Sequence, residues 1–190
     1  MSLEKMVEYF KQTDLNGLEI QNLIGRPPVL YSDLAQYSSV DKLLGDFNYC
    51  IILYQTSSRT SGHFVALTRN DTTGKIRFFD SYGFFPDQER QFTKYDQMIP
   101  PYLTQLLKGH DFEYNSVDYQ AKQSNITTCG RHSSMACHLR NLSLAQIKEF
   151  YTDNKSQFLN KADNAVTLLT ILGLRDIRKF FTAGSRADNY

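Results

Sequence analysis

The sequence predicts an α+β fold, in which a central block of strands lies between helical segments on both sides along the chain. Strand-like runs rich in isoleucine, phenylalanine and tyrosine occur between residues 48 and 118, and the segments before and after them show apolar residues at helical spacing. The 190 residues suffice to bury one good core, and no repeat or linker divides them. We therefore expect a single domain, residues 1–190, with a mixed or antiparallel central sheet packed by helices.

The first elements follow from local spacing. Leu3, Met6, Val7 and Phe10 recur with helical periodicity behind Ser2, which predicts an amphipathic helix with a serine cap. Residues 16–45 break into short pieces, which we interpret as connecting structure containing one short capped helix in SVDKLLGD. The apolar run of residues 48–55 predicts a buried strand that takes Cys50 inside.

The next two runs predict a β-hairpin. Residues 63–69 and 75–80 flank the turn sequence NDTTG, whose asparagine, aspartate and glycine favour a tight connection. His63 and Asp80 stand at the two ends away from that turn. We therefore expect them to be neighbours across the ladder, where a carboxylate can reach an imidazole.

The rest of the chain is mostly helical. Residues 81–88 form a turn-rich loop, residues 97–109 predict a helix begun at a proline pair, and residues 112–118 alternate as one more strand. A helix begins near Cys129 with Thr127 or Thr128 as its cap, and its small residues predict burial against the sheet. Three helical segments follow, at 143–154, 162–173 and 174–181.

Composition restricts the partners and the compartment. The formal net charge of +1 gives no argument for binding to nucleic acid or to a membrane surface. The first residues lack an apolar signal core and no later run is long enough to span a bilayer, so we expect no membrane association and no secretion by that route. An odd number of cysteines, three, indicates free thiols in a reducing compartment.

Cys129 is the strongest candidate for a reactive residue. A thiol in the first turn of a helix faces unpaired backbone N–H groups and the positive end of the helix dipole, and both favour the thiolate. The alternative is that Cys129 is a buried small hydrophobic residue, as most free cysteines are. Cys50 and Cys137 fit that alternative better, because one is in mid-strand and the other lies two helical turns beyond Cys129.

His63, Asp80 and Gln123 complete a pattern around that cysteine. Asp80 follows two phenylalanines, where an unpaired charge is costly, and His63 is placed to be its partner. Gln123 lies six residues before Cys129 and can supply an amide beside the cysteine N–H for an oxyanion. Cysteine catalysis needs these four residue types: a thiol, an imidazole base, a carboxylate that orients the base and a donor for the oxyanion. The alternatives are a structural histidine, an aspartate that caps the turn of residues 81–83, and a solvated glutamine.

Other residues offer rival sites. Cys129, His132, Cys137 and His138 crowd into ten positions and suggest zinc, but on one helix they point to different faces and no CxxC pair occurs. His132 is an alternative base, although its place in a buried helix favours packing. A basic cluster near the C-terminus can contact DNA or an acidic partner, or be a solvated helix face; it comprises Arg175, Arg178, Lys179 and Arg186.

The strings GHFVAL, RFFDSYG and QSNITTCG resemble the His, Asp and Gln-x5-Cys-Gly motifs of the adenain and Ulp1-like cysteine proteases. GLEIQNLIG, VLYSDLAQY, SGHFVALTR and FFDSYGFFPD are similar, more particularly, to capsid-maturation proteases of virophages, Polinton/Maverick elements and some large DNA viruses. The resemblance covers roughly residues 14–150. It implies that Cys129 is the nucleophile, His63 the general base, Asp80 the orienting carboxylate and Gln123 the oxyanion donor. Phe64 stands where the family commonly has tryptophan.

This resemblance implies the cysteine-protease fold and a cysteine endopeptidase that needs no metal or organic cofactor. Its substrate would be protein, namely capsid proteins during virion maturation, with DNA or a peptide as a possible activator. The expected location is the virion and the cytoplasm or viral factory of the infected cell. Aromatic side chains of Tyr82, Phe84 and Phe85 could narrow the cleft to small substrate residues. A deconjugase of ubiquitin-like modifiers and a catalytically silent capsid-binding module are the alternatives.

Overall fold

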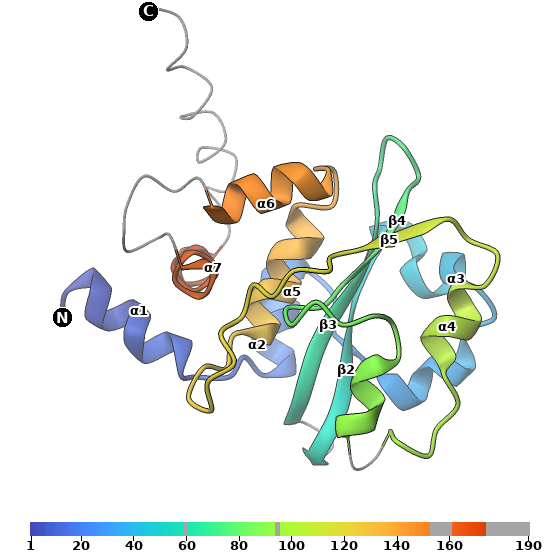
Figure 1. Ribbon diagram of the computed structural model, residues 1–190, viewed down its shortest axis with the longest axis horizontal. Coiled ribbons are helices and arrows are strands. Elements are labelled where there is room, and N and C mark those ends of the chain that lie inside the picture. Colours follow the sequence, from blue (N-terminus) through green and yellow to red (C-terminus); the bar gives the residue numbers. More distant parts are fainter. Residues whose placement is uncertain (59–60, 94–95, 153–160, 174–190) are drawn as a thin grey trace, which may run out of the picture.

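A five-stranded mixed sheet lies between two groups of helices in the computed structural model, which describes residues 1–58, 61–93, 96–152 and 161–173 (Figure 1). The strands are adjacent in chain order: β1 (Val29–Leu30), β2 (Tyr49–Ser58), β3 (Ser61–Arg69), β4 (Ile76–Phe79) and β5 (Phe112–Tyr114). The pairs β2–β3 and β3–β4 are antiparallel, whereas β1 and β5 run parallel to their neighbours. The expected mixed sheet packed by helices is confirmed.

Helices cover both faces of the sheet, so alternate residues of each central strand enter different cores. On one face, α2 (Gly17–Ile24) and α5 (Cys129–His138) pack over Ile51, Phe64 and Ala66. On the other face, the 3₁₀ helix η1 (Tyr31–Gln36), α3 (Val40–Leu44) and α4 (Tyr102–Leu107) cover residues that include Ile52 and Val65. Nearly every residue of α5 is buried, as its small side chains predicted.

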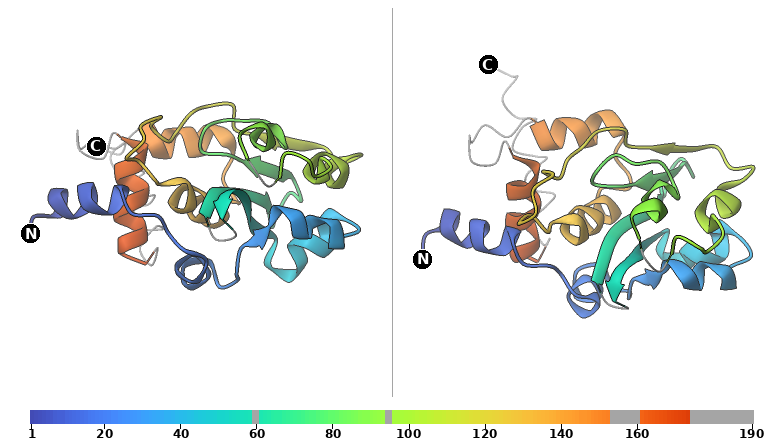
Figure 2. Two further views of the ribbon diagram at one scale, coloured as in Figure 1. Left: turned by 90° about the horizontal axis from the view of Figure 1, so that it is seen from below. Right: turned by 60° about the horizontal axis from the view of Figure 1, so that its bottom comes forward.

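Three further helices lie at the α5 side of the molecule: α1 (Leu3–Lys11), α6 (Leu144–Thr152) and α7 (Ala162–Ile171). Figure 2 shows α1 lying against α7 at one end, away from the sheet. The expected helix over residues 174–181 and the basic cluster of Arg175, Arg178, Lys179 and Arg186 lie outside the described residues. No described helix has the length and apolar character needed to cross a membrane.

Residues 16–45 are more ordered than the sequence analysis expected. They contain α2, which begins with a full capping box: the Asn16 side chain accepts from the Glu19 N–H, and the Glu19 carboxylate accepts from the Asn16 N–H. Ile20 and Ile24, four residues apart, are buried against α5. They also contain β1, a strand of two residues, too short for a periodic pattern. The interpretation as connecting structure was therefore wrong for these segments, whereas the short capped helix was confirmed as α3.

Candidate active site

Backbone crowding sets the position of His63. Gly62 and His63 pair with Gln55 and Tyr54 of β2, beside an irregularity in the ladder between Gln55 and Ser58. A Cβ atom on Gly62 would lie 1.8 Å from the Tyr54 carbonyl oxygen, so only glycine allows β2 to approach this closely. The glycine therefore lets the strand carry His63 to the sheet end, where its ring is nearly buried.

Asp80 is not directly opposite His63, which corrects the expected hairpin register. The β3–β4 ladder ends with the pair Ala66 and Phe79, so Asp80 lies just beyond it. Its backbone bonds a side chain instead: the Asp80 N–H donates to Asn115 Oδ1 at 2.9 Å, and Asn115 Nδ2 donates to the Asp80 carbonyl at 2.6 Å. Asn115, which the sequence analysis did not select, thus fixes where the carboxylate leaves the sheet.

The His63 and Asp80 side chains nevertheless meet. His63 Nε2 lies 3.2 Å from Asp80 Oδ1, which also accepts the Tyr82 N–H at 2.7 Å. The Tyr82 ring stacks on the imidazole, with centroids 5.0 Å apart. The expected contact between base and carboxylate is present, therefore, although the strands do not place the two residues directly opposite each other.

Cys129 is the first residue of α5, where the predicted helix begins, and is 8% exposed. The first turn of a helix leaves its N–H groups without intrahelical acceptors, so the sulfur and these donors lie together. The expected cap position is confirmed at Thr128, but its side chain does not cap the helix. Thr128 occupies the cap position, but its hydroxyl donates to the Asp163 carboxylate rather than accepting from the helix. Thr127 donates to the Lys11 carbonyl.

Electrostatics link the three residues. Burial alone would lower the pKa of His63, but the charge and hydrogen bond of Asp80, together with a hydrogen bond and charge from Cys129, raise it well above its ordinary value. Both neighbours therefore favour the protonated imidazole over the neutral ring. Because Asp80 takes Nε2, the other ring nitrogen, Nδ1, is left for the sulfur.

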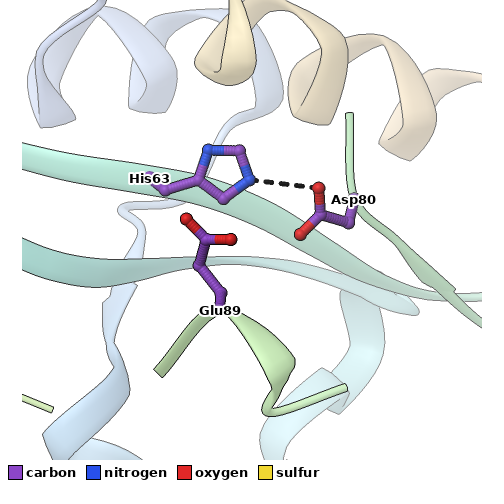
Figure 3. Close-up of side chains that lie close together, drawn as sticks. All are labelled: His63, Asp80 and Glu89. Carbon is purple, nitrogen blue, oxygen red and sulfur yellow. Dashed lines mark hydrogen bonds and ion pairs between the residues drawn. The ribbon is translucent and has the colours of Figure 1, made fainter. Parts of the chain in front are cut away.

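Glu89 is a further member of this site that the sequence analysis missed. It lies on the 3₁₀ helix η3 (Gln88–Phe92), just beyond the loop expected at residues 81–88, and is 7% exposed. Figure 3 shows its carboxyl group directed toward His63 and Asp80. One ligand-type atom from each of these three residues lies within 4.8 Å of the other two, so they are the described residues best placed to hold a cation. A single glutamate in DQERQF forms no sequence pattern from which its position in the site could have been predicted.

Gln123 is exposed in the loop before α5, where it lines an open cavity of about 510 Å³. Among the described residues its amide makes no hydrogen bond, so its role as oxyanion donor stays a prediction. Gln120 is the buried glutamine of this loop: it accepts from Ser81 Oγ at 2.8 Å and donates to the Tyr82 hydroxyl at 3.1 Å. It thereby ties the loop to the ring that stacks on His63.

The rival residues have other partners. His132 is fully buried between the Tyr151 hydroxyl, at 3.3 Å from Nδ1, and Asp163, at 3.1 Å from Nε2. His138 Nε2 lies 3.1 Å from the Leu23 carbonyl. Cys137 is buried, which raises its pKa, and burial raises the pKa of Cys50 to about 12. Neither thiol is therefore activated, and the four suggested zinc ligands do not converge.

Aromatic side chains extend from the site to the surface. The centroid of the Phe84 ring lies 6.1 Å from that of Tyr82 and 5.6 Å from that of Phe92. Phe92 is mostly exposed. Phe85 points elsewhere and packs against Phe112 and Tyr114. Phe64 is buried and packs close to Gly130 of α5. It therefore supports the helix that carries Cys129.

Comparison with known proteins found one curated relative, and no family model matches the chain. The relative is the uncharacterized protein V9 of Sputnik virophage, 28% identical over 176 residues that cover 88% of this chain and 99% of that protein. Among solved structures, the chain is similar to the SUMO protease Ulp1 with its catalytic cysteine oxidized to a sulfinic acid, with 18% identity and a TM-score of 0.31 over 91% of this chain and 77% of that one.

A second similar structure is the C-terminal Ulp1 protease domain in complex with Smt3, the yeast ortholog of SUMO. Its identity is 14% and its TM-score 0.31, over 90% of this chain and 75% of that one. At these scores the likeness carries no argument about the site.

Proposed function

We propose that this chain is a cysteine endopeptidase in which Cys129 is the nucleophile, His63 the proton carrier and Asp80 the residue that orients the imidazole. The observation that carries this proposal is the buried hydrogen bond between His63 and Asp80, beside a free thiol at the start of a helix. A histidine held at one nitrogen by a carboxylate can exchange a proton with the thiol through the other.

The chemistry follows in two stages. The Cys129 thiolate attacks the carbonyl carbon of a peptide bond, and the oxyanion accepts hydrogen bonds from the Cys129 N–H and, in our proposal, from Gln123. His63 gives its proton to the departing amine, which leaves an acyl-enzyme. His63 then removes a proton from water, whose oxygen displaces the sulfur and releases the carboxylic acid product.

The proposed substrates are capsid proteins of a virophage-like virus, cleaved during virion maturation in the infected cell. A virophage relative over nearly its whole length supports a viral origin. The aromatic side chains of Tyr82 and Phe84 stand beside His63 and would restrict the size of the substrate residue next to the cleaved bond. A DNA or peptide activator belongs to the same proposal, although the basic cluster lies outside the described residues.

The test is proteolysis with matched cysteine variants. The purified full chain is incubated with capsid proteins of a virophage and, separately, with a ubiquitin-like conjugate, and new N-termini are sequenced. Cys129→Ala should abolish cleavage, whereas Cys137→Ala, which removes a buried thiol from the same helix, should retain it. Cleavage of the conjugate alone would make the protein a deconjugase. Cleavage that persists in Cys129→Ala would overturn the assignment of the nucleophile.

A further inference from the structure

Two buried oxygen atoms in this site have no hydrogen-bond partner among the described residues. They are Asp80 Oδ2 and Glu89 Oε2, on side chains that are 0% and 7% exposed. Figure 3 shows the free oxygen of Asp80 directed toward the carboxyl group of Glu89. Unpaired buried oxygens are costly, and these two carboxyl groups face each other.

A proton on Glu89 would give both oxygen atoms a hydrogen-bond partner at once. If both carboxyl groups were ionised, two buried negative charges would lie beside one imidazolium, and neither free oxygen could donate to the other. A protonated Glu89 is neutral and carries one O–H donor, and Asp80 Oδ2 is the nearby acceptor still without a donor. Burial raises the pKa of Glu89 to about 7, with His63 opposing and Asp80 adding to the shift.

The helix η3 holds Glu89 in place. Asp87, just before η3, accepts from the Tyr31 hydroxyl at 2.5 Å and from the Thr104 N–H at 2.7 Å. These bonds join η3 to the core face covered by η1 and α4. The carboxyl group of Glu89 is therefore delivered to the site by a well-anchored segment.

We propose that Glu89 is a positioning residue, whose protonated carboxyl group donates a hydrogen bond to Asp80 Oδ2 and so fixes the carboxylate that orients His63. The ionisable groups that act on Glu89 are Asp80 and, from β3, His63. Tyr82, which burial keeps neutral, stacks on His63, and Cys129 from α5 is hydrogen-bonded to His63. When the proton leaves to water as pH rises through about 7, Asp80 loses a donor, and the imidazole that is hydrogen-bonded to Cys129 gains a second negative charge beside it.

The role in orienting His63 for catalysis rests on the proposed protease function, but the first test does not. The rate at which iodoacetamide alkylates Cys129 is measured between about pH 5 and 9 by mass spectrometry of its peptide, with EDTA present. Ionisation of Glu89 disfavours the thiolate, so the wild type should show a slowing step near pH 7 of at least about three-fold. Glu89→Gln keeps a donor but cannot titrate, and should lack this step.

The matched control is Asp96→Asn, which alters another buried carboxyl group, one that accepts the Gln55 N–H. It should retain the step. The proposal would be overturned if the slowing of alkylation near pH 7 persisted in Glu89→Gln. It would also be overturned if the wild type showed no such slowing. A step that appears only after Zn²⁺ is added and EDTA is omitted would assign the three-residue cluster to a cation instead.

A kinetic measurement then tests the positioning role. At about pH 6, Glu89→Leu should lower kcat by about ten-fold with KM unchanged, and Glu89→Gln should remain within about two-fold of the wild type. Equal kcat values for the leucine variant and the wild type would refute positioning. If no variant cleaves any protein while the alkylation step behaves as expected, then the protease proposal fails and the Glu89–Asp80 bond stands.

Discussion

Two buried histidine–carboxylate pairs lie near the N-terminal part of α5, and they differ in how completely their hydrogen bonds are filled. In one, His63 Nε2 is 3.2 Å from Asp80; in the other, His132 Nε2 is 3.1 Å from Asp163. Distance and burial hardly distinguish the two pairs. The hydrogen-bond partners around each pair do distinguish them.

In the His132–Asp163 pair each side-chain nitrogen and oxygen has a partner. His132 Nδ1 contacts the Tyr151 hydroxyl, and Asp163 also accepts from the Thr128 hydroxyl and from the Ala121 N–H at 2.9 Å. Burial alone would raise the pKa of Asp163, but these bonds outweigh it and lower the pKa. The His63–Asp80 pair leaves Asp80 Oδ2 without a hydrogen-bond partner among the described residues and faces a thiol. The filled pair is therefore suited to a structural role, whereas the other pair keeps the open positions that our proposed chemistry needs.

The largest expected effect is on catalysis. His63→Ala removes the proposed proton carrier, so kcat/KM on a cleaved capsid protein should fall by at least about 10³-fold. In the folded fraction of His132→Ala, by contrast, kcat/KM should remain within about ten-fold of the wild type. Steady-state kinetics on both variants, normalised to folded protein by circular dichroism, checks the contrast. Similar losses in the two variants would remove the distinction between the pairs.

The next effect is on stability. His132→Ala leaves Asp163 as a buried carboxylate without its imidazole and opens a cavity beside Tyr151, so the free energy of unfolding should fall by about 3–5 kcal/mol. Urea denaturation measures this free energy, with unfolding followed by tyrosine fluorescence, because the chain contains no tryptophan. The conservative replacement His132→Gln, which can still donate to Asp163, should recover part of this loss. A loss below about 1 kcal/mol for His132→Ala would contradict a structural role.

The sequence could predict what depends on neighbours along the chain. The strand-like run of residues 63–69, the turn NDTTG and the small residues after Cys129 were enough to place β3, β4 and α5, the elements that carry or adjoin His63, Asp80 and Cys129. The His132–Asp163 pair, by contrast, forms through the packing of α7 on α5. Glu89 reaches the site because the 3₁₀ helix η3 packs beside it. Such contacts join segments that are distant in the sequence, and the local pattern of one segment does not indicate which other segment it will pack against.

A smaller effect on stability comes from Glu89 and depends on pH. Its pKa rises from 4.5 to about 7 in the folded chain, so between these values the folded state binds more protons than the unfolded state, and the free energy of unfolding falls as pH increases. Glu89→Gln cannot titrate. It should therefore be more stable than the wild type by roughly 2–3 kcal/mol at pH 8, with the difference shrinking toward zero near pH 5. Urea titrations at both pH values check this; a difference that does not change with pH would contradict it.

The smallest effect should come from the outermost bond of the filled pair. Thr128→Val removes the hydroxyl that donates to Asp163 but keeps the side-chain shape, while His132 and the Ala121 N–H continue to bind the carboxylate. The free energy of unfolding should therefore fall by only about 1–2 kcal/mol, and kcat should not change. Thr127→Val is the matched control, because that hydroxyl donates only a long bond to the Lys11 carbonyl, and its loss should be within about 0.5 kcal/mol. A ten-fold drop in kcat for Thr128→Val with unchanged stability would mean that the second pair acts on Cys129 directly, through the residue that precedes it.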